Sequence, residues 1–115
     1  MLFCRLFGKI DEIVPTKEVA SGTTLVGDDK KSYIQRMLSL GQSTKVDGFV
    51  CQLSTNDATK NKTLGEISEG YELQDFDAQT ITGAMEYIIC NAKQIWNLLF
   101  FTRILTMKMI IIKLW

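Results

Sequence analysis

Two short polar stretches hold the residues of this chain that could do chemistry. The first is the small-residue turn 21–24 (SGTT), which contains Gly22, and the second is the pair Asn56-Asp57. An asparagine amide donates hydrogen bonds and an aspartate carboxylate accepts them, so the pair can hold a polar ligand or a backbone loop. Glycine adopts positive φ and lets a ligand approach the backbone closely.

The elements around these stretches indicate how they are positioned. The apolar run Phe49–Leu53 ends abruptly in a polar Ser-Thr-Asn-Asp tip, which is typical of a buried parallel strand that delivers side chains to the carboxyl edge of a sheet. Apolar residues at near-helical spacing predict a helix over about Asp29–Leu40, between the glycine turn and this strand. The alternative is that Asn56-Asp57 only forms an N-cap or Asx-turn leading out of the strand.

In their order and spacing, the two stretches resemble the SGNH, or GDSL-type, hydrolases. In that family a small-residue turn with an invariant glycine and a later strand ending in Asn-Asp are two of four conserved blocks. Gly22 matches the glycine and Asn56 the asparagine, and the resemblance extends from about Glu18 to about Lys93. It implies an α/β fold, a flavodoxin-like three-layer sandwich with a parallel sheet, here incomplete at both ends.

The other two blocks of the family are missing. Family members carry a nucleophilic serine in a Gly-Asp-Ser turn near the N-terminus and an Asp-x-x-His block near the C-terminus, and this chain has neither block and no histidine. Losing serine or histidine from such a relay costs on the order of a million-fold in turnover. We therefore expect the Gly-Asp-Ser turn to lie upstream of this sequence, and the chain to be a fragment of an ester hydrolase that is inactive alone.

The resemblance also implies roles for the residues that are present. The backbone N–H of Gly22 and the side-chain amide of Asn56 would form an oxyanion hole, each donor being worth about 3 kcal/mol in the transition state. Asp57 is expected to hold the loop after Asn56 by accepting hydrogen bonds from nearby backbone N–H groups. The substrate would be an ester or thioester if the domain were complete, and no cofactor is expected.

Composition narrows the classes of partner. The chain has 13 basic and 13 acidic residues, and this zero net charge argues against a nucleic-acid partner. Its three cysteines, Cys4, Cys51 and Cys90, are odd in number and far apart, which is typical of reduced core residues and favours a cytoplasmic location. No Cys or His spacing suits a metal, and no glycine-rich phosphate loop is present.

The residues after Asp57 predict a loop and then a long helix. The polar segment Ala58–Gly70 is interpreted as a long loop over the carboxyl edge of the sheet, and the alternative is a solvated connector. Its lysines, Lys60 among them, and its glutamates are typical of a solvated face and not of ligands. Residues Asp75 to Asp77 are expected to start and cap the next helix. An apolar stripe on that helix is expected to pack against the sheet; it consists of Ile81, Met85, Ile88, Ile89 and Ala92.

The chain divides into a partial hydrolase domain at 1–97 and an apolar tail at 98–115. Charged residues break the tail into apolar pieces too short to span a membrane, so an interfacial amphipathic helix fits better than a transmembrane one. One permitted codon choice, read in a shifted frame, spells an Asn/Asp/Tyr-rich loop like that of the family, which suggests a frameshift near Asn97 or Leu98. The alternative function is a small non-catalytic binding or membrane-surface protein that uses this tail. The sequence makes no prediction of oligomeric state.

Overall fold

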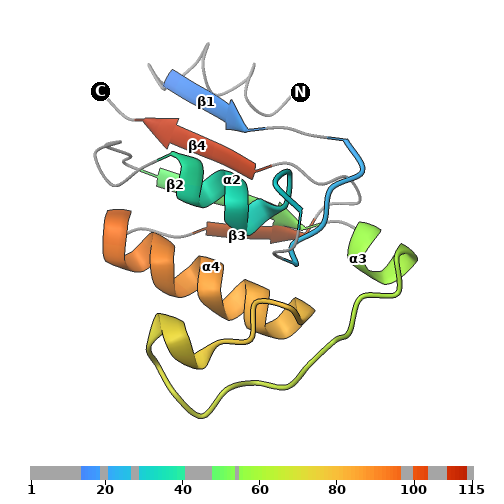
Figure 1. Ribbon diagram of the computed structural model, residues 1–115. Coiled ribbons are helices and arrows are strands. Elements are labelled where there is room, and N and C mark those ends of the chain that lie inside the picture. Colours follow the sequence, from blue (N-terminus) through green and yellow to red (C-terminus); the bar gives the residue numbers. More distant parts are fainter. Residues whose placement is uncertain are drawn as a thin grey trace.

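The computed structural model describes residues 14–18, 21–26, 29–40, 48–53, 55–96, 100–103 and 109–113 (Figure 1). Its elements in chain order are β1 (Val14–Glu18), α2 (Tyr33–Ser39), β2 (Gly48–Leu53), α3 (Asn56–Thr59), η1 (Leu73–Asp75), α4 (Ile81–Trp96), β3 (Phe100–Arg103) and β4 (Met109–Lys113). The predicted strand at 49–53 is therefore confirmed as β2. Cys4 lies outside the described residues.

The four strands form one mixed sheet in the order β1-β4-β2-β3. Among the strands that the structure describes, only β2 and β3 pair in parallel, whereas β4 runs antiparallel to both β1 and β2. The expected α/β three-layer sandwich with a parallel sheet is therefore wrong. Strand β4 begins six residues after β3 ends in the sequence, and parallel strands need a connection of about a dozen residues or more, so β4 is antiparallel to β2 whereas β3 is parallel to it. Among residues with described side chains, helices supply most of the regular structure.

A single cluster of buried side chains joins α2, α4 and β2. The ring centroids of Phe49 on β2 and Trp96 on α4 lie 5.0 Å apart. Figure 1 shows α4 running alongside α2, with β2 behind them. The members of the cluster are Leu25, Tyr33, Ile34, Met37, Phe49, Cys51, Ala84, Ile88, Ala92 and Trp96. Its burial accounts for the position of both helices.

Helix α4 confirms most of the predicted apolar stripe. Ile88 and Ala92 are fully buried, and Ile81 and Met85 pack at the edge of the same cluster. The spacing of Ile89 predicts a core position, but the structure places this residue on another face of the helix, where it lines a surface pocket.

Both helices begin later than predicted. Helix α2 starts at Tyr33, because residues 29–32 form a turn in which the backbone N–H of Ser32 donates to the carbonyl oxygen of Asp29 at 2.8 Å. The side chain of Ser32 then caps the helix. Helix α4 is capped by Thr80, whose Oγ1 accepts from the N–H of Gly83 at 3.1 Å, and not by the predicted segment Asp75 to Asp77.

The polar segment after α3 is a loop, as predicted, but it does not run over the carboxyl edge of the sheet. It runs beside the start of α4. There the N–H of Ile81 donates to the carbonyl oxygen of Thr63 at 2.9 Å, and the N–H of Thr82 donates to that of Leu64 at 2.8 Å. In Figure 1 this loop crosses below α4, away from the strands. These two hydrogen bonds satisfy donors that the first turn of a helix otherwise leaves without partners.

The apolar tail contributes β3 and β4 to the sheet. Its backbone pairs with the predicted hydrolase segment on both sides of β2. The proposed frameshift junction at Asn97 and Leu98 lies outside the described residues, so the frameshift and the boundary at 97 stay predictions. In the described part of the chain, no helix combines the length and the apolar character that crossing a membrane requires. Use of the tail for docking also stays a prediction.

Candidate functional site

The side chain of Asp57 links its own segment to the residues that directly follow the turn at Gly22. Its carboxylate is buried and accepts from the N–H of Leu25 at 3.0 Å through both oxygens, and from the N–H of Val26 at 3.4 Å. The expectation that Asp57 bonds nearby backbone is therefore wrong about its partners, which lie 31 and 32 residues upstream. A charged acceptor that satisfies two buried donors makes a strong tether.

Asn56 bonds to the glycine turn. Its Nδ2 donates to the carbonyl oxygen of Thr23 at 2.9 Å, across 33 residues of sequence. The alternative that Asn56 is a helix N-cap is wrong, because the N-cap position of α3 is Thr55, whose side chain makes no capping hydrogen bond. The Asn56 amide therefore serves a tertiary contact.

Gly22 lies beside this contact with an unusual backbone conformation. Its φ is +70°, a value that side-chain-bearing residues adopt only with strain. A Cβ added at Gly22 would meet no atom within 4 Å, so glycine is required here for its conformation and the space in front of it is open. The structure thus brings the turn of Gly22 next to Asn56, as the resemblance implies. Their role as an oxyanion hole stays a prediction.

Lys60 completes the site and was missed in the sequence. Its Nζ donates a hydrogen bond to the carbonyl oxygen of Gly22, whereas sequence reasoning assigned it to a solvated face. The available signal was its spacing, because Lys60 follows Asn56 by four residues and such residues share one face of a helical turn. Lys60 adds a positive charge beside the open space at Gly22.

A buried group of ionisable side chains lies next to this site. The guanidinium of Arg36 stands 5.4 Å from the centre of the Tyr33 ring. Burial raises the pKa of the Cys51 thiol to about 12, and the positive charge of Arg36 opposes this shift. Burial also raises the pKa of Tyr33, with smaller effects from Cys51, Arg36 and Asp57. Both groups are neutral at pH 7, so Cys51 is a packed thiol and not a nucleophile.

The prediction that the cysteines are core residues is confirmed for Cys51, which belongs to the buried cluster, and is wrong for Cys90, which lines a surface pocket. Cys51 is buried and free, and Cys90 is half-buried and free. In the described ranges, no group of three or more His, Cys, Asp and Glu side chains is placed to hold a metal ion.

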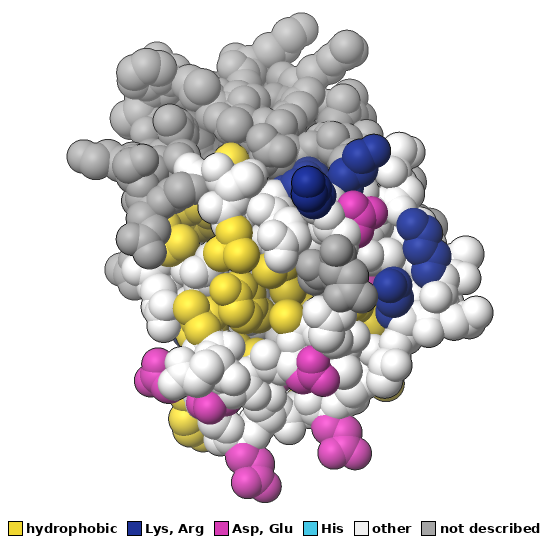
Figure 2. Space-filling model, in the orientation of Figure 1, with side chains coloured by type: hydrophobic (Ala, Val, Ile, Leu, Met, Phe, Trp, Pro, Cys, Tyr) yellow, Lys and Arg dark blue, Asp and Glu magenta, His cyan; other side chains and the backbone are white. Residues whose placement is uncertain are grey.

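Charge is divided between two regions of the surface. Figure 2 shows lysine and arginine side chains gathered toward α3, with an acidic side chain among them, and further acidic side chains over the loop and η1 below α4. Lys60 is one of the cations on the side of the site, because its Nζ donates to the carbonyl oxygen of Gly22. A hydrogen-bond donor set in a positive field favours an anion or a developing oxyanion.

No protein-family model, curated protein or solved structure matches this chain. The resemblance to the SGNH hydrolases therefore remains a prediction from the order of the residues and from the contact between the two stretches.

Proposed function

We propose that Gly22, Asn56 and Lys60 form the oxyanion-holding part of an SGNH-type ester hydrolase, and that this chain binds the acyl group without hydrolysing esters by itself. The observation that supports the proposal is the hydrogen bond from the Asn56 amide to the carbonyl oxygen of Thr23, which joins the segment of Asn56 to the turn of Gly22. This contact joins two segments that lie 33 residues apart in sequence and that carry the resemblance.

The chemistry of the site suits an anionic oxygen. The backbone of Gly22 and the amide of Asn56 supply neutral donors, and Lys60 supplies a cation one residue beyond the end of α3. Asp57 adds no competing acceptor, since its carboxylate is buried and engaged by two N–H groups. Each donor aimed at an oxyanion contributes about 3 kcal/mol to the transition state.

Hydrolysis needs groups that this sequence lacks. The chain contains no histidine, so no Ser-His relay can form in it. The buried thiol of Cys51 stays protonated below a pKa of about 12 and does not replace the relay. Ester substrates therefore bind but are not turned over. Free thiols at Cys51 and Cys90 support a cytoplasmic location within this proposal.

The binding half of the proposal is tested by nuclear magnetic resonance with methylphosphonate, a tetrahedral anion. Addition of methylphosphonate should shift the backbone N–H signal of Gly22 and the side-chain amide signals of Asn56. Asn56→Asp removes the amide donors and should abolish the shift at Gly22. Asn61→Asp, the same substitution at an exposed residue outside the site, should leave the shift intact. If Gly22 does not respond in the unmodified chain, the oxyanion role is rejected.

The catalytic half is tested separately with p-nitrophenyl acetate. We expect neither a stoichiometric burst of nitrophenolate nor steady release above the buffer rate. Any burst would overturn the claim that the chain is inactive alone. A burst that persists when the cysteines are replaced would reveal an acyl-enzyme on another nucleophile. The two assays are independent, so the binding role can be rejected without rejecting the absence of turnover, and the reverse.

A further inference from the structure

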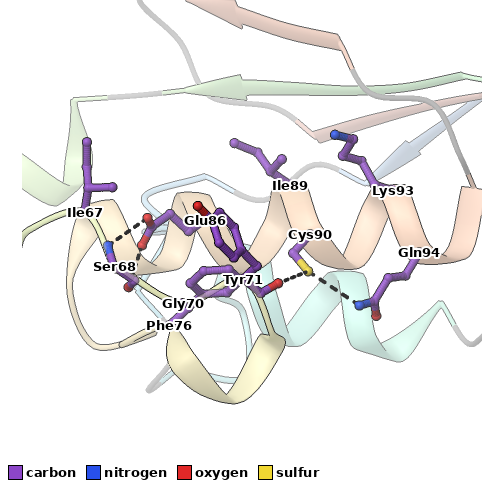
Figure 3. A pocket seen from close by; sticks show the side chains of 10 residues that line it. All are labelled: Ile67, Ser68, Gly70, Tyr71, Phe76, Glu86, Ile89, Cys90, Lys93 and Gln94. Atoms are coloured by element: carbon purple, nitrogen blue, oxygen red, sulfur yellow. Dashed lines mark hydrogen bonds between the residues drawn. The ribbon is translucent and has the colours of Figure 1, made fainter.

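A pocket of about 470 Å³ opens between the loop after α3 and a face of α4 that turns away from the core. This size falls within the range of small-molecule sites in proteins. The lining residues are Ile67, Ser68, Gly70, Tyr71, Phe76, Glu86, Ile89, Cys90, Lys93 and Gln94 (Figure 3). None of them belongs to the site at Gly22 and Asn56.

Helix α4 supplies one wall of the pocket as a continuous stripe. Its lining residues recur at spacings of three, four, seven and eight from Glu86, which places them on one face of the helix. Two hydrogen bonds fasten the loop to this face: Ser68 donates its N–H and its hydroxyl to the two carboxylate oxygens of Glu86, each at 3.0 Å. The pocket is thus held by specific contacts.

Two aromatic rings supply the opposite wall. Tyr71 is 88% exposed and Phe76 is half-buried, and Figure 3 shows both rings between Ser68 and Cys90. Phe76 directly follows η1, which a reciprocal capping box between Glu72 and Asp75 stabilises. An aromatic ring left this exposed beside a concavity offers its negative π face to a ligand.

The loop beside the pocket and the first turns of α4 carry an excess of acidic residues although the chain is neutral overall. No Lys or Arg occurs from Thr63 to Ala92, whereas this segment holds six acidic residues. Five of the six are exposed, and Figure 2 shows acidic side chains over this loop and η1. The sixth, Glu86, lines the pocket itself, and a carboxylate has about four acceptor sites, of which Ser68 occupies two.

We propose that this pocket binds a small organic cation, an ammonium group carried on an aromatic or branched apolar body. The ammonium lies at the carboxylate of Glu86 and against the faces of Tyr71 and Phe76, and the apolar body packs on Ile89. Lys93 stands at the other end of the pocket, seven residues and about 10 Å further along α4, so it does not neutralise the Glu86 end.

The test uses isothermal titration of the full chain with benzyltrimethylammonium, and with phenylacetate as a probe of similar shape and opposite charge. The cation should bind saturably at millimolar concentration and more weakly as sodium chloride is added, and phenylacetate should bind at least about tenfold more weakly. Equal or tighter binding of phenylacetate would overturn the proposal. So would the absence of saturable heat with the cation.

Three variants separate the pocket from general acidic attraction. Glu86→Gln should weaken binding of the cation at least about fivefold, because one full charge at the contact is lost. Tyr71→Ala, at an exposed ring that the fold does not need, should weaken it about two- to fivefold. Glu66→Gln changes the same charge at an exposed residue outside the pocket and should alter affinity by less than about twofold. A loss in Glu66→Gln equal to that in Glu86→Gln would refute specific binding.

Discussion

Replacing Asp57 by alanine should destabilise this protein more than any other loss of a single carboxylate among the described residues. The Asp57 carboxylate is the acceptor for the N–H groups of Leu25 and Val26, and both residues are at most 3% exposed. Water cannot replace the lost acceptor at such buried donors. The variant Asp57→Ala therefore leaves two backbone donors without partners inside the protein.

The size of this effect follows from the two donors. Each buried donor left unsatisfied costs about 1–3 kcal/mol, so Asp57→Ala should lower the free energy of unfolding by about 2–6 kcal/mol. That is a large part of the 5–15 kcal/mol, roughly, by which domains of this size are stable. With an m value of about 1–3 kcal/mol per molar urea, the unfolding midpoint should fall by at least about 1 M.

Urea unfolding followed by circular dichroism measures the effect, with Asp29→Ala as the matched control. The Asp29 carboxylate also accepts a backbone N–H, that of Lys31 at 2.9 Å, but this bond is exposed and local. Water can replace it, so Asp29→Ala should cost about 0.5 kcal/mol or less. Equal losses in Asp57→Ala and Asp29→Ala would refute the reasoning that burial of the donors sets the cost.

Three further substitutions test other contacts of the fold. Gly83→Ala should lower the melting temperature, because a Cβ at this position would collide with the carbonyl oxygen of Asp77. Alanine by itself favours helices over glycine by about 1 kcal/mol, so a higher melting temperature would contradict the contact. Thr80→Ala should lower the free energy of unfolding by about 1 kcal/mol, because it removes the hydroxyl that accepts from the N–H of Gly83. Thr80→Ser keeps a hydroxyl and should retain most of that stability. Equal stability of the two variants would exclude the cap. The wild-type chain should lose stability as pH rises from 9 toward 12. The reason is that the Cys51 thiol ionises near the ordinary thiol pKa of 9.0 in the unfolded chain but only at about 12 in the folded chain. This group should lower the free energy of unfolding by at most about 1.4 kcal/mol per pH unit. Cys51→Ala should show a shallower alkaline loss in urea titrations at pH 9 and 10.5, and identical slopes would show that Cys51 is not responsible.

Local patterns in the sequence determined the parts of the fold that depend on neighbours a few residues apart. The apolar run before Asn56 predicted β2, because a strand buried on both faces is a nearly continuous apolar run. Spacing of three and four predicted the core face of α4, as Ile88 and Ala92 show. The turn at Gly22 was predicted to need positive φ or close approach, and positive φ is what the structure has.

Some of the candidate site was also predictable. The resemblance carried by Gly22 and Asn56 implied that the two would share a site, and the hydrogen bond from Asn56 to Thr23 joins their segments. Lys60 was not predicted, because a lysine in a polar stretch is usually solvated and only the helical turn of α3 brings its Nζ to the carbonyl oxygen of Gly22. The acid-rich pocket was missed because its walls come from a loop and a helix face.

Only the tertiary structure decided the direction of the strands and the partners of the buried carboxylate. The tail reads as an apolar extension, and nothing local to it indicates that β4 lies between β1 and β2 and runs antiparallel to both. Likewise, the sequence around Asp57 shows a polar tip but not that its acceptors serve Leu25 and Val26. Periodicity reports which side of an element avoids water, a property of that element alone. Pairing across 30 residues or more depends on which non-local contacts together recover the entropy of closing the chain, and that balance is a property of the whole fold.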